Sequence, residues 1–249
     1  MDLQAQCELG QEQLTRMEYR QAERTLAAAE AIAWRERDFD TLSRLYMPLQ
    51  EARRQIRQRC GEGVVCLDLI AQGPDDHISA DHVMRHYPHG QLLVGGWGTI
   101  APAVELRNLA AENGLYLETF LAAVYPVGGA RAVAIVALED AKLPPPGETT
   151  IDALLHQLPP NSILLHENEL PEGSRRGSAE TFAEVMGMWE RLHAPYLAAA
   201  DATADPVRRI EAYRQTIRVD YACELAHQKL SDTARQLTRQ RPASRSEAV

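Results

Sequence analysis

A glycine-rich turn is the first segment of this sequence whose residue types could support chemistry. The turn, Gly95-Gly96-Trp97-Gly98, follows an apolar run and precedes a helix expected from Pro102. Glycines let a backbone approach a ligand closely, and the amides at a helix N-terminus favour an anion. The segment lacks the Gly-x-Gly-x-x-Gly register and the Gly-Lys-Ser/Thr ending of phosphate-binding loops. The alternative is a tight structural turn in which Trp97 fills a gap in the core.

Acidic side chains and one histidine follow two expected strands further along the chain. They are Glu139, Asp140, His166, Glu167 and Glu169. In open α/β sheets, ligands bind outside the carboxyl ends of the strands, where carboxylates and histidine can act as general acids or bases. The alternative is that these are ordinary polar loops. We take Glu139, His166 and Glu167, together with the glycine turn, as candidate ligand-binding residues, and we assign no catalytic residue.

Four histidines crowd one short stretch: His77, His82, His86 and His89. His82 and His86 are four residues apart and would project from one face of a helix, as paired metal ligands must. The Glu that follows the first histidine in zinc proteases is absent, and no third ligand is evident. We therefore expect solvent-facing histidines, no bound metal and no other cofactor.

No serine or cysteine has the local sequence of a catalytic nucleophile. The chain contains no Gly-x-Ser-x-Gly segment, and Cys7, Cys60, Cys66 and Cys223 form neither a CxxC pair nor a metal-ligand spacing. We expect four buried, reduced thiols of a cytoplasmic protein. Asp68, inside an apolar run, needs either a partner or an exposed edge. These observations favour a non-catalytic protein over an enzyme.

Composition and charge restrict the class of protein. The 249 residues suit one large domain or two small ones, and 45% of them are apolar, which is enough for a core. A net charge of -9 with scattered basic residues argues against a general nucleic-acid binder. No apolar stretch reaches the ~18 residues of a membrane helix, and the N-terminus lacks the pattern of a secretory signal. We expect no nucleic-acid and no membrane partner.

The middle of the chain, residues 62–173, has the pattern of a separate α/β unit. Short apolar runs bounded by Gly, Pro and Asn are expected as strands: Val64–Ala71, Leu92–Gly95, Leu117–Val127, Ala132–Leu138 and Ile163–Leu165. Helices are expected after Ser79, over Pro102–Ala111 and over Ile151–Leu158. Gly128-Gly129 indicates a hairpin turn. The order β-α-β-α-β-β-α-β predicts a mixed sheet with helices against it.

The first residues of the chain have a helical period with a polar break near Arg16–Glu18, which predicts two helices joined by a tight turn. The positions that carry the pattern are Leu9-Gly10 on the first helix and Tyr19, Ala22, Leu26 and Ala29 on the second. At these positions the segment resembles a tetratricopeptide repeat, a helical hairpin of roughly 34 residues. Gln6 and Trp34 replace the usual aromatic residue and proline.

Two further stretches extend this helical pattern. An apolar stripe from Phe39 to Ile56 predicts a third helix, which Pro48 should kink or divide. A stripe from Trp189 to Ala200 predicts a helix near the other end of the chain. Asp205-Pro206 is a good helix start after it, because proline is tolerated at the first helical position.

The C-terminal helices also resemble tetratricopeptide hairpins, with a break near Asp220. The matching positions are Tyr213 and Thr216, then Leu230-Ser231, whereas Arg209 and Tyr221 replace the usual Ala and Pro. The resemblance covers residues 3–58 and 180–238. It implies a concave helical surface that holds a partner protein or peptide. A generic helical bundle is the alternative.

Together these patterns predict an α+β or α/β fold, with tetratricopeptide-like hairpins at both termini and an inserted mixed-sheet α/β unit. The expected segments are 1–61, 62–173, 174–239 and a disordered tail, 240–249. Repeat arrays need about three units to bury their apolar faces, and neither end has three. We therefore expect the two ends to pack together. Packing of each end on the sheet or on another subunit is the alternative.

The leading functional hypothesis is a non-catalytic interaction or scaffold protein with a protein or peptide partner. One alternative is a small-molecule-binding or catalytic α/β domain that uses the glycine turn, with the helices as accessories. Another is a structural subunit of a homo-oligomer. Polar side chains converging on a helical groove would favour the first hypothesis, and a deep pocket at the strand ends would favour the second.

Overall fold

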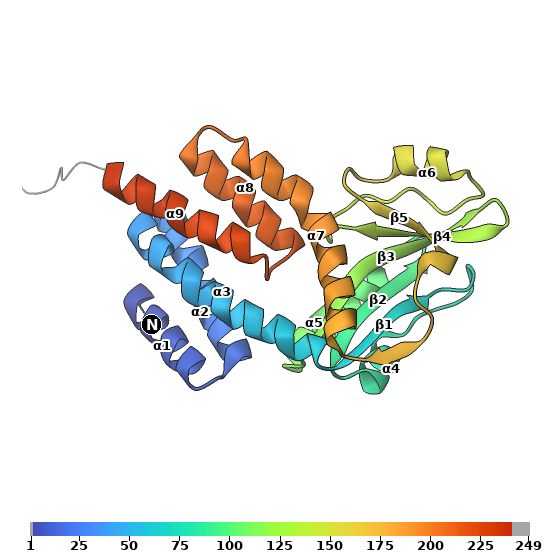
Figure 1. Ribbon diagram of the computed structural model, residues 1–249, viewed down its shortest axis with the longest axis horizontal. Helices are drawn as coiled ribbons and strands as arrows, with labels where there is room; N and C mark the ends of the chain where they lie inside the picture. Colours follow the sequence, from blue (N-terminus) through green and yellow to red (C-terminus); the bar gives the residue numbers. More distant parts are fainter. Residues whose placement is uncertain (1, 241–249) are drawn as a thin grey trace, which may run out of the picture. The chain divides into compact units, whose positions relative to one another are not determined.

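Helices form both ends of the chain and a mixed sheet forms its middle, in a computed structural model that describes residues 2–240 (Figure 1). The helices are α1 (Leu3–Thr15), α2 (Tyr19–Glu36), α3 (Phe39–Gly61), α4 (Ala80–His86), α5 (Ala101–Glu112), α6 (Ile151–Gln157), the 3-10 turn η1 (Glu167–Glu169), α7 (Ala179–Asp201), α8 (Pro206–Val219) and α9 (Glu224–Gln240). The strands are β1 (Val64–Ile70), β2 (Gly90–Trp97), β3 (Leu117–Val127), β4 (Ala130–Val136), β5 (Ile163–His166) and β6 (Ser174–Arg176). The predicted fold class is confirmed.

The described chain divides into two compact units. The helical unit contains the residues up to Ile56 together with those from His193 onward. The sheet unit contains residues 57–192. The divisions fall inside α3 and α7, so each of these helices contributes residues to both units.

The sheet has the strand order β5-β4-β3-β2-β1-β6. Strands β1, β2 and β3 run parallel and are connected through α4 and α5, whereas β4, β5 and β6 each pair antiparallel to a neighbour. The β3–β4 turn uses Gly128 (φ 59°) and Gly129 (φ 80°). Two positive φ angles suit the two-residue turns that match the twist of a hairpin. The mixed sheet and this hairpin are therefore as predicted.

One face of the sheet carries the main apolar core of the sheet unit. Alternate residues of the strands, such as Leu92 and Val94 on β2, pack with α4, α5 and α6. The Ser79 hydroxyl accepts a hydrogen bond from the His82 amide (3.3 Å) and caps α4, as expected. Gly114 has φ 66° just beyond the end of α5, a conformation that favours glycine.

The other face of the sheet carries a buried polar group. Arg57 pairs with Glu118 on β3 (Nε–Oε2 3.1 Å), and Gln91 on β2 donates to the same carboxylate (2.7 Å). The Arg57 guanidinium lies 4.6 Å from the ring centroid of Trp189, which stacks on Phe120 at 4.4 Å. Hydrogen bonds and ring contacts thus offset the cost of burying these charges.

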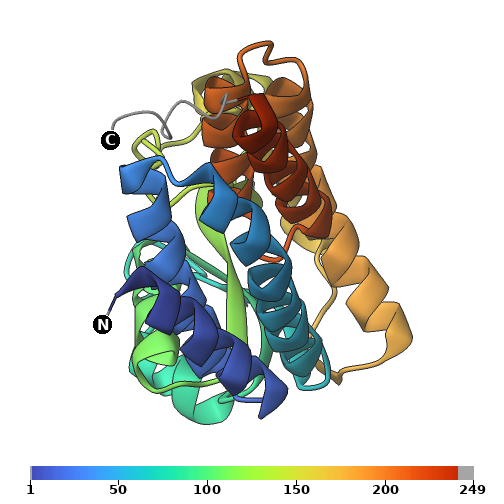
Figure 2. The same ribbon diagram turned by 90° about the vertical axis from the view of Figure 1, so that its left-hand side faces the viewer.

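In the helical unit, an apolar cluster contains residues from both ends of the chain. Figure 2 shows the helices of both ends. The cluster combines Leu26 and Leu42 from the N-terminal helices with Ile210 and Leu230 from α8 and α9. Polar contacts also join the two ends, because Arg214 pairs with Glu30 (2.7 Å). The two ends therefore pack together, as the shortage of repeats at each end predicted.

Three local features of the helices bear on the predictions. The polar break after α1 contains Met17 in the left-handed region (φ 61°). Of the two outcomes expected at Pro48, a kink or a division, the division does not occur, because α3 continues through this residue. Leu45 and Leu49 are buried on either side of Pro48, and this packing outweighs the one backbone hydrogen bond that proline removes.

The predicted disordered tail lies outside the described residues, except Gln240, which ends α9. Among residues 2–240, no helix has both the length and the apolar character that a membrane crossing requires.

Candidate functional site

The glycine turn lies at the end of β2, where the carboxyl ends of the parallel strands meet. The amide of Gly96 donates to the carbonyl of Thr99 (3.1 Å), and the amide of Gly98 donates to the carbonyl of Val124 on β3 (2.9 Å). The hydroxyl of Thr99 accepts from the amide of Ala101 at the start of α5 (3.1 Å). These amides therefore bond to the chain itself and not toward an open anion site.

The space around the glycines explains why the turn needs them. A Cβ at Gly98, which has φ 62°, would lie 2.5 Å from Cδ of Pro146, and one at Gly96 would lie 2.8 Å from Cγ2 of Thr99. A Cβ at Gly95 would lie 3.3 Å from the Cβ of Ala122. The backbone at these positions is approached by other parts of the same chain. The geometry is that of a tight structural turn with Trp97 half-buried at its centre.

Glu139 and the glycine turn lie at opposite ends of the strands. It follows β4, which runs antiparallel to β3 and ends beside Leu121 near the start of that strand. Its carboxylate accepts from Nη1 of Arg107 on α5 (3.2 Å), and the same guanidinium donates to the carbonyl of Thr119 (2.7 Å). Burial lowers the pKa of Arg107, and the charge of Glu139 opposes this shift. Glu139 thus fastens α5 to the sheet, and the chain does not bring it to the other candidates.

His166 and Glu167 lie at the same end of the strands as the glycine turn, but three strands away from β2. His166 ends β5, and successive strands are spaced by about 4.8 Å, so it is about 14 Å from β2 across the sheet. Its amide donates to the Glu169 carboxylate (2.6 Å), which caps η1. Glu167 pairs with Arg131 of β4, which also reaches the Gln72 side chain. These contacts fix loops, and the predicted residues do not converge on one point.

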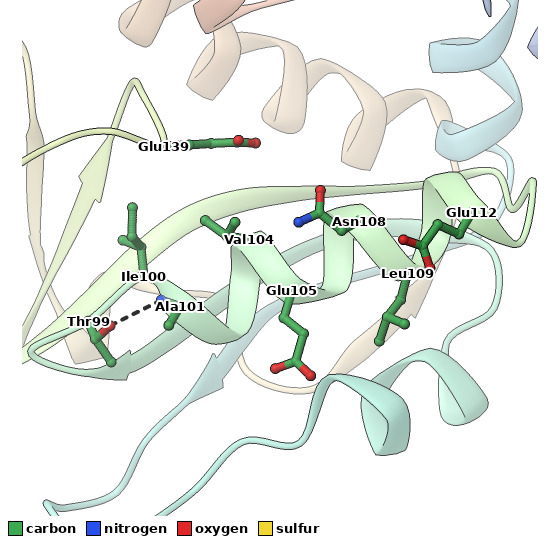
Figure 3. A pocket seen from close by; sticks show the side chains of 9 residues that line it. All are labelled: Thr99, Ile100, Ala101, Val104, Glu105, Asn108, Leu109, Glu112 and Glu139. Atoms are coloured by element: carbon green, nitrogen blue, oxygen red, sulfur yellow. Dashed lines mark hydrogen bonds between the residues drawn. The ribbon is translucent and has the colours of Figure 1, made fainter.

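A shallow, open depression of about 650 Å³ follows the outer side of α5 (Figure 3). Its lining residues are Thr99, Ile100, Ala101, Val104, Glu105, Asn108, Leu109, Glu112 and Glu139. The carboxylates of Glu105 and Glu139 lie on opposite sides of the helix in Figure 3. Two carboxylates that diverge in this way do not frame a reacting atom, as a general acid and base must.

The histidine stretch forms a ring contact and not a metal cluster. His82 and His86 lie on α4 with ring centroids 4.1 Å apart, and Nδ1 of His86 is 2.9 Å from the carbonyl oxygen of His82. His89 instead contacts the ring of Tyr116 (6.2 Å). Over residues 2–240, no three His, Cys, Asp or Glu side chains are grouped to hold a metal ion.

Asp68 and the cysteines have the surroundings that their residue types require. The Asp68 carboxylate accepts from the amide of Gly173 (2.6 Å), just before β6, and from the thiol of Cys66 (3.2 Å). All four cysteines are free and buried, as predicted. Burial and the Asp68 carboxylate raise the pKa of Cys66 to about 11, so this thiol is unsuited to act as a nucleophile.

A narrow cleft of about 70 Å³ lies in the helical unit between α1 and α3, and we call it the α1–α3 cleft. Its lining residues are Gln4, Cys7, Glu8, Gln11, Thr41, Arg44 and Leu45. Cys7 and Leu45 are buried, and Gln4, Glu8, Gln11 and Arg44 are exposed. The cleft therefore has an apolar floor and a polar rim with charges of both signs.

Sequence reasoning did not find the α1–α3 cleft. Residues from Gln4 to Gln11 read as the solvent side of one helix, and Arg44 as the solvent side of another, so nothing in either segment alone indicates a shared groove. The available hint was the tetratricopeptide pattern, which makes α1 and α3 the first helices of successive repeats. No protein-family model, no curated protein and no solved structure matches this chain.

Proposed function

We propose that this chain is a non-catalytic interaction or scaffold protein that binds a protein or peptide partner through its helical unit. The observation that carries the proposal is the α1–α3 cleft. Amide and charged groups from Gln4, Gln11 and Arg44 rise around an apolar floor. Such a rim can bond to the backbone and side chains of an extended peptide, while the floor takes an apolar side chain.

The packing of α1 on α2 supports a tetratricopeptide-like reading of this unit. Ala22, Leu26 and Ala29 are fully buried at the positions that the repeat pattern assigns to the helix contact. A Cβ at Gly10 would lie 2.6 Å from Cγ of Leu26, so only glycine allows this close approach. At the other end of the chain, Thr216 and Leu230 are likewise fully buried. The proposal therefore treats both ends as parts of one short repeat-like surface.

The sheet unit supports the non-catalytic part of the proposal. The glycine-turn amides of Gly96 and Gly98 are bonded within the chain, and the carboxylates along α5 diverge. Four free, buried cysteines are compatible with a reducing compartment, which supports the proposal of a cytoplasmic protein.

The test compares two charge reversals made in the whole chain. Arg44→Glu changes the rim of the cleft, and Arg35→Glu changes another exposed arginine, on α2, that does not line it. Both positions are surface sites, so we expect folding stability to change by less than about 1 kcal/mol in each variant. Affinity capture from the native cell should recover a protein with the wild type and with Arg35→Glu, but not with Arg44→Glu.

Two results would contradict the proposal. One is capture of the same protein by all three chains, which would place its contact outside the cleft. The other is capture of no protein at all. Light scattering that shows a dimer or larger assembly of the purified chain would favour the homo-oligomer. A small molecule that stabilises the wild type in a thermal-shift screen would favour the ligand-binding alternative.

A further inference from the structure

The depression along the outer side of α5, which we call the α5 depression, has charges of only one sign. Of the nine described residues that line it, three are glutamates, Glu105, Glu112 and Glu139, and none is a lysine, an arginine or a histidine. All nine belong to the sheet unit, so the depression is formed within one unit of the chain. The rim of the α1–α3 cleft, by contrast, carries charges of both signs.

Two of these three carboxylates have no cation to neutralise them. Glu139 pairs with Arg107 (3.2 Å), but among residues 2–240 neither Glu105 nor Glu112 forms an ion pair. Both of these side chains are exposed on the outer face of α5. Unpaired carboxylates give the surface a negative potential, which a cationic partner can neutralise. The depression is therefore complementary to a positively charged surface.

The spacing of Glu105 and Glu112 determines which cations can meet both of them. They are seven residues apart, which is nearly two full turns, so both side chains leave α5 at almost the same angle. At a rise of about 1.5 Å per residue, the two positions are about 10 Å apart along the helix axis. Leu109 lies between them and extends on the same side of α5 as Glu105 (Figure 3). This side thus presents a carboxylate, an apolar side chain and a second carboxylate in order.

Apolar side chains form much of the remaining lining. Ile100 is buried, and Val104 and Leu109 are half-buried. The last two pack partly against the core of the sheet unit, and they also line the depression. Val104 extends on the side of Glu139 in Figure 3. A partner that covers these side chains buries apolar area while its cations meet the carboxylates.

The shape of the α5 depression suits a segment of another protein better than a small ligand or a metal ion. Its volume of about 650 Å³ has room for several side chains. Small-molecule sites enclose most of their ligand, whereas this depression is shallow and open. In the described part of the chain, no three His, Cys, Asp or Glu side chains are grouped to hold a metal ion.

An amphipathic helix fits this face better than an extended peptide. Extended peptides bind mainly through backbone hydrogen bonds to the edge of a sheet, and the backbone groups inside a helix are already bonded. At the end of α5, the carbonyl of Leu109 also accepts a hydrogen bond from the Asn113 side chain (2.8 Å). A partner helix bonds its own backbone and presents residues seven apart on one face. Its cations at that spacing match Glu105 and Glu112.

We propose that the α5 depression is a docking surface for a cationic amphipathic helix of a second protein. Two Lys or Arg residues of that helix, seven positions apart, pair with Glu105 and Glu112, and the apolar side chains between them cover Leu109. The proposal goes beyond the docking function of the α1–α3 cleft and does not depend on it, because the depression lies in the other unit. A chain with two docking surfaces can hold two partners, as a scaffold must.

The test uses designed peptides as probes of the whole chain. The matched probe is a fluorescein-labelled helical peptide of about 18 residues, rich in alanine, with two lysines seven positions apart and leucines between them on the same face. The spacing control has the same composition, but its lysines are five positions apart and lie on different faces of the helix. Fluorescence anisotropy at low salt should show the matched probe binding at least about fivefold more tightly than the spacing control.

Variants of the chain then locate the contact. Glu105→Gln together with Glu112→Gln should weaken binding of the matched probe about fivefold or more, because two exposed ion pairs are lost. Glu190→Gln, at an exposed carboxylate of α7 in the same unit, is the matched control and should leave the affinity unchanged. Glu105→Lys together with Glu112→Lys should instead bind a probe in which both lysines are replaced by glutamates. All of these positions are exposed, so folding should be retained.

Four results would overturn the proposal. Equal affinities of the matched probe and the spacing control would mean that the net charge of -9 attracts any cationic peptide. Equal effects of Glu190→Gln and the double Gln variant would mean the same. Absence of binding up to about 1 mM of the matched probe would mean that the depression docks no such helix. Light scattering that shows a dimer of the wild type but a monomer of the double Gln variant would make a second copy the occupant. Arg44→Glu should bind the matched probe as the wild type does, which separates this surface from the α1–α3 cleft.

Discussion

Gly98 is the residue of the glycine turn at which substitution should be most costly. It has φ 62°, and an added Cβ would lie 2.5 Å from Cδ of Pro146. An alanine there must adopt a left-handed backbone and displace a proline ring, so we expect Gly98→Ala to lower the free energy of unfolding by about 1–3 kcal/mol. Urea denaturation measures this change.

A second glycine supplies the control for that substitution. Gly73 has nothing within 4 Å of an added Cβ, so Gly73→Ala should change stability by less than about 0.5 kcal/mol. Equal effects of the two substitutions would show that the turn is not strained. A ligand that stabilises the wild type but not a folded Gly98→Ala protein would instead show that the turn binds a ligand.

One half-buried histidine, His193, and one buried histidine, His227, should set the pH of maximum stability. Burial lowers the pKa of His193, but hydrogen bonding, first of all to Asp220, outweighs burial and raises this pKa to about 10 on folding. Its contribution is therefore fully present below pH about 6.5 and is lost as pH rises through about 10. Burial, reinforced by Arg53, lowers the pKa of His227 to about 3, so stability is lost as pH falls from about 6.5 toward 3. Each limb has a slope of up to ~1.4 kcal/mol per pH unit. The two limbs meet near pH 6.5.

The measurement is the free energy of unfolding from pH 4 to pH 10 in the wild type and in two variants. His227→Gln should flatten the acid limb and leave the alkaline limb, and His193→Gln should do the reverse. An alkaline limb that keeps its slope in His193→Gln would mean that other groups cause it.

At the residue scale, the sequence indicated which residues have unusual requirements, but it did not indicate which residues contact them in the fold. The glycine turn was expected from its composition, but its contacts with Val124 and Pro146 depend on two other segments. His193 and Asp220 form a hydrogen-bonded pair (2.7 Å) but are 27 positions apart in the sequence, and no local spacing links them. The sequence indicated a break between two helices near Asp220, but it did not indicate which residue contacts this carboxylate.

Helix packing at Gly10 gives a prediction at the scale of an element. Alanine normally stabilises a helix interior by about 1 kcal/mol relative to glycine. At Gly10, however, the new Cβ would lie 2.6 Å from Cγ of Leu26 and would push α1 away from α2. We therefore expect Gly10→Ala to destabilise the protein by about 1–3 kcal/mol.

Gly187 is the matched position in another helix. It lies inside α7 and has nothing within 4 Å of an added Cβ, so Gly187→Ala should stabilise the protein by about 0.5–1 kcal/mol. Both substitutions replace a glycine by alanine inside a helix, but the changes that they cause in the free energy of unfolding should have opposite signs. Chemical denaturation of both variants measures these changes in the free energy of unfolding. A stabilising Gly10→Ala would show that α1 and α2 are not closely packed.

Most elements could be predicted because their apolar residues recur with a regular period. Strand β3 has the predicted bounds, Leu117–Val127, since both faces of it are buried and the run is unbroken. Strand β6 was missed because Ser174–Arg176 has no apolar residue, and it pairs with β1 through its backbone. A strand that pairs through its backbone alone does not produce a periodic pattern of apolar residues in the sequence.

At the scale of the whole molecule, the shared core of the helical unit gives the sharpest prediction. A chain ending at residue 203 lacks α8 and α9, and with them Ile210, Tyr213 and Leu230 of that core. We expect amide hydrogens of α1, α2 and α3 to exchange at least about a hundredfold faster in this fragment. Amides of β2 and β3 should keep their protection, because the sheet unit loses no residue.

Hydrogen exchange monitored by mass spectrometry on both chains makes this comparison. Unchanged protection of α1 and α2 in the fragment would show that the N-terminal helices are stable alone. The packing of the two ends was predictable from sequence because one hairpin cannot bury its apolar face. The structure added which helices meet, which depends on the tertiary fit of Leu26, Leu42 and their partners.

The division of the helical unit between the two ends of the chain has a consequence for synthesis on the ribosome. The helices α1 and α2 emerge well before the α8 and α9 residues that complete their core, because residues 37–205 are translated between them. At 5–20 residues per second, that interval is on the order of ten to forty seconds. The sheet unit is complete in the meantime, while the nascent N-terminal helices expose Leu26 and Leu42. A chaperone that binds apolar segments of nascent chains should therefore engage α1 and α2 early and release them only after α8 and α9 have been translated.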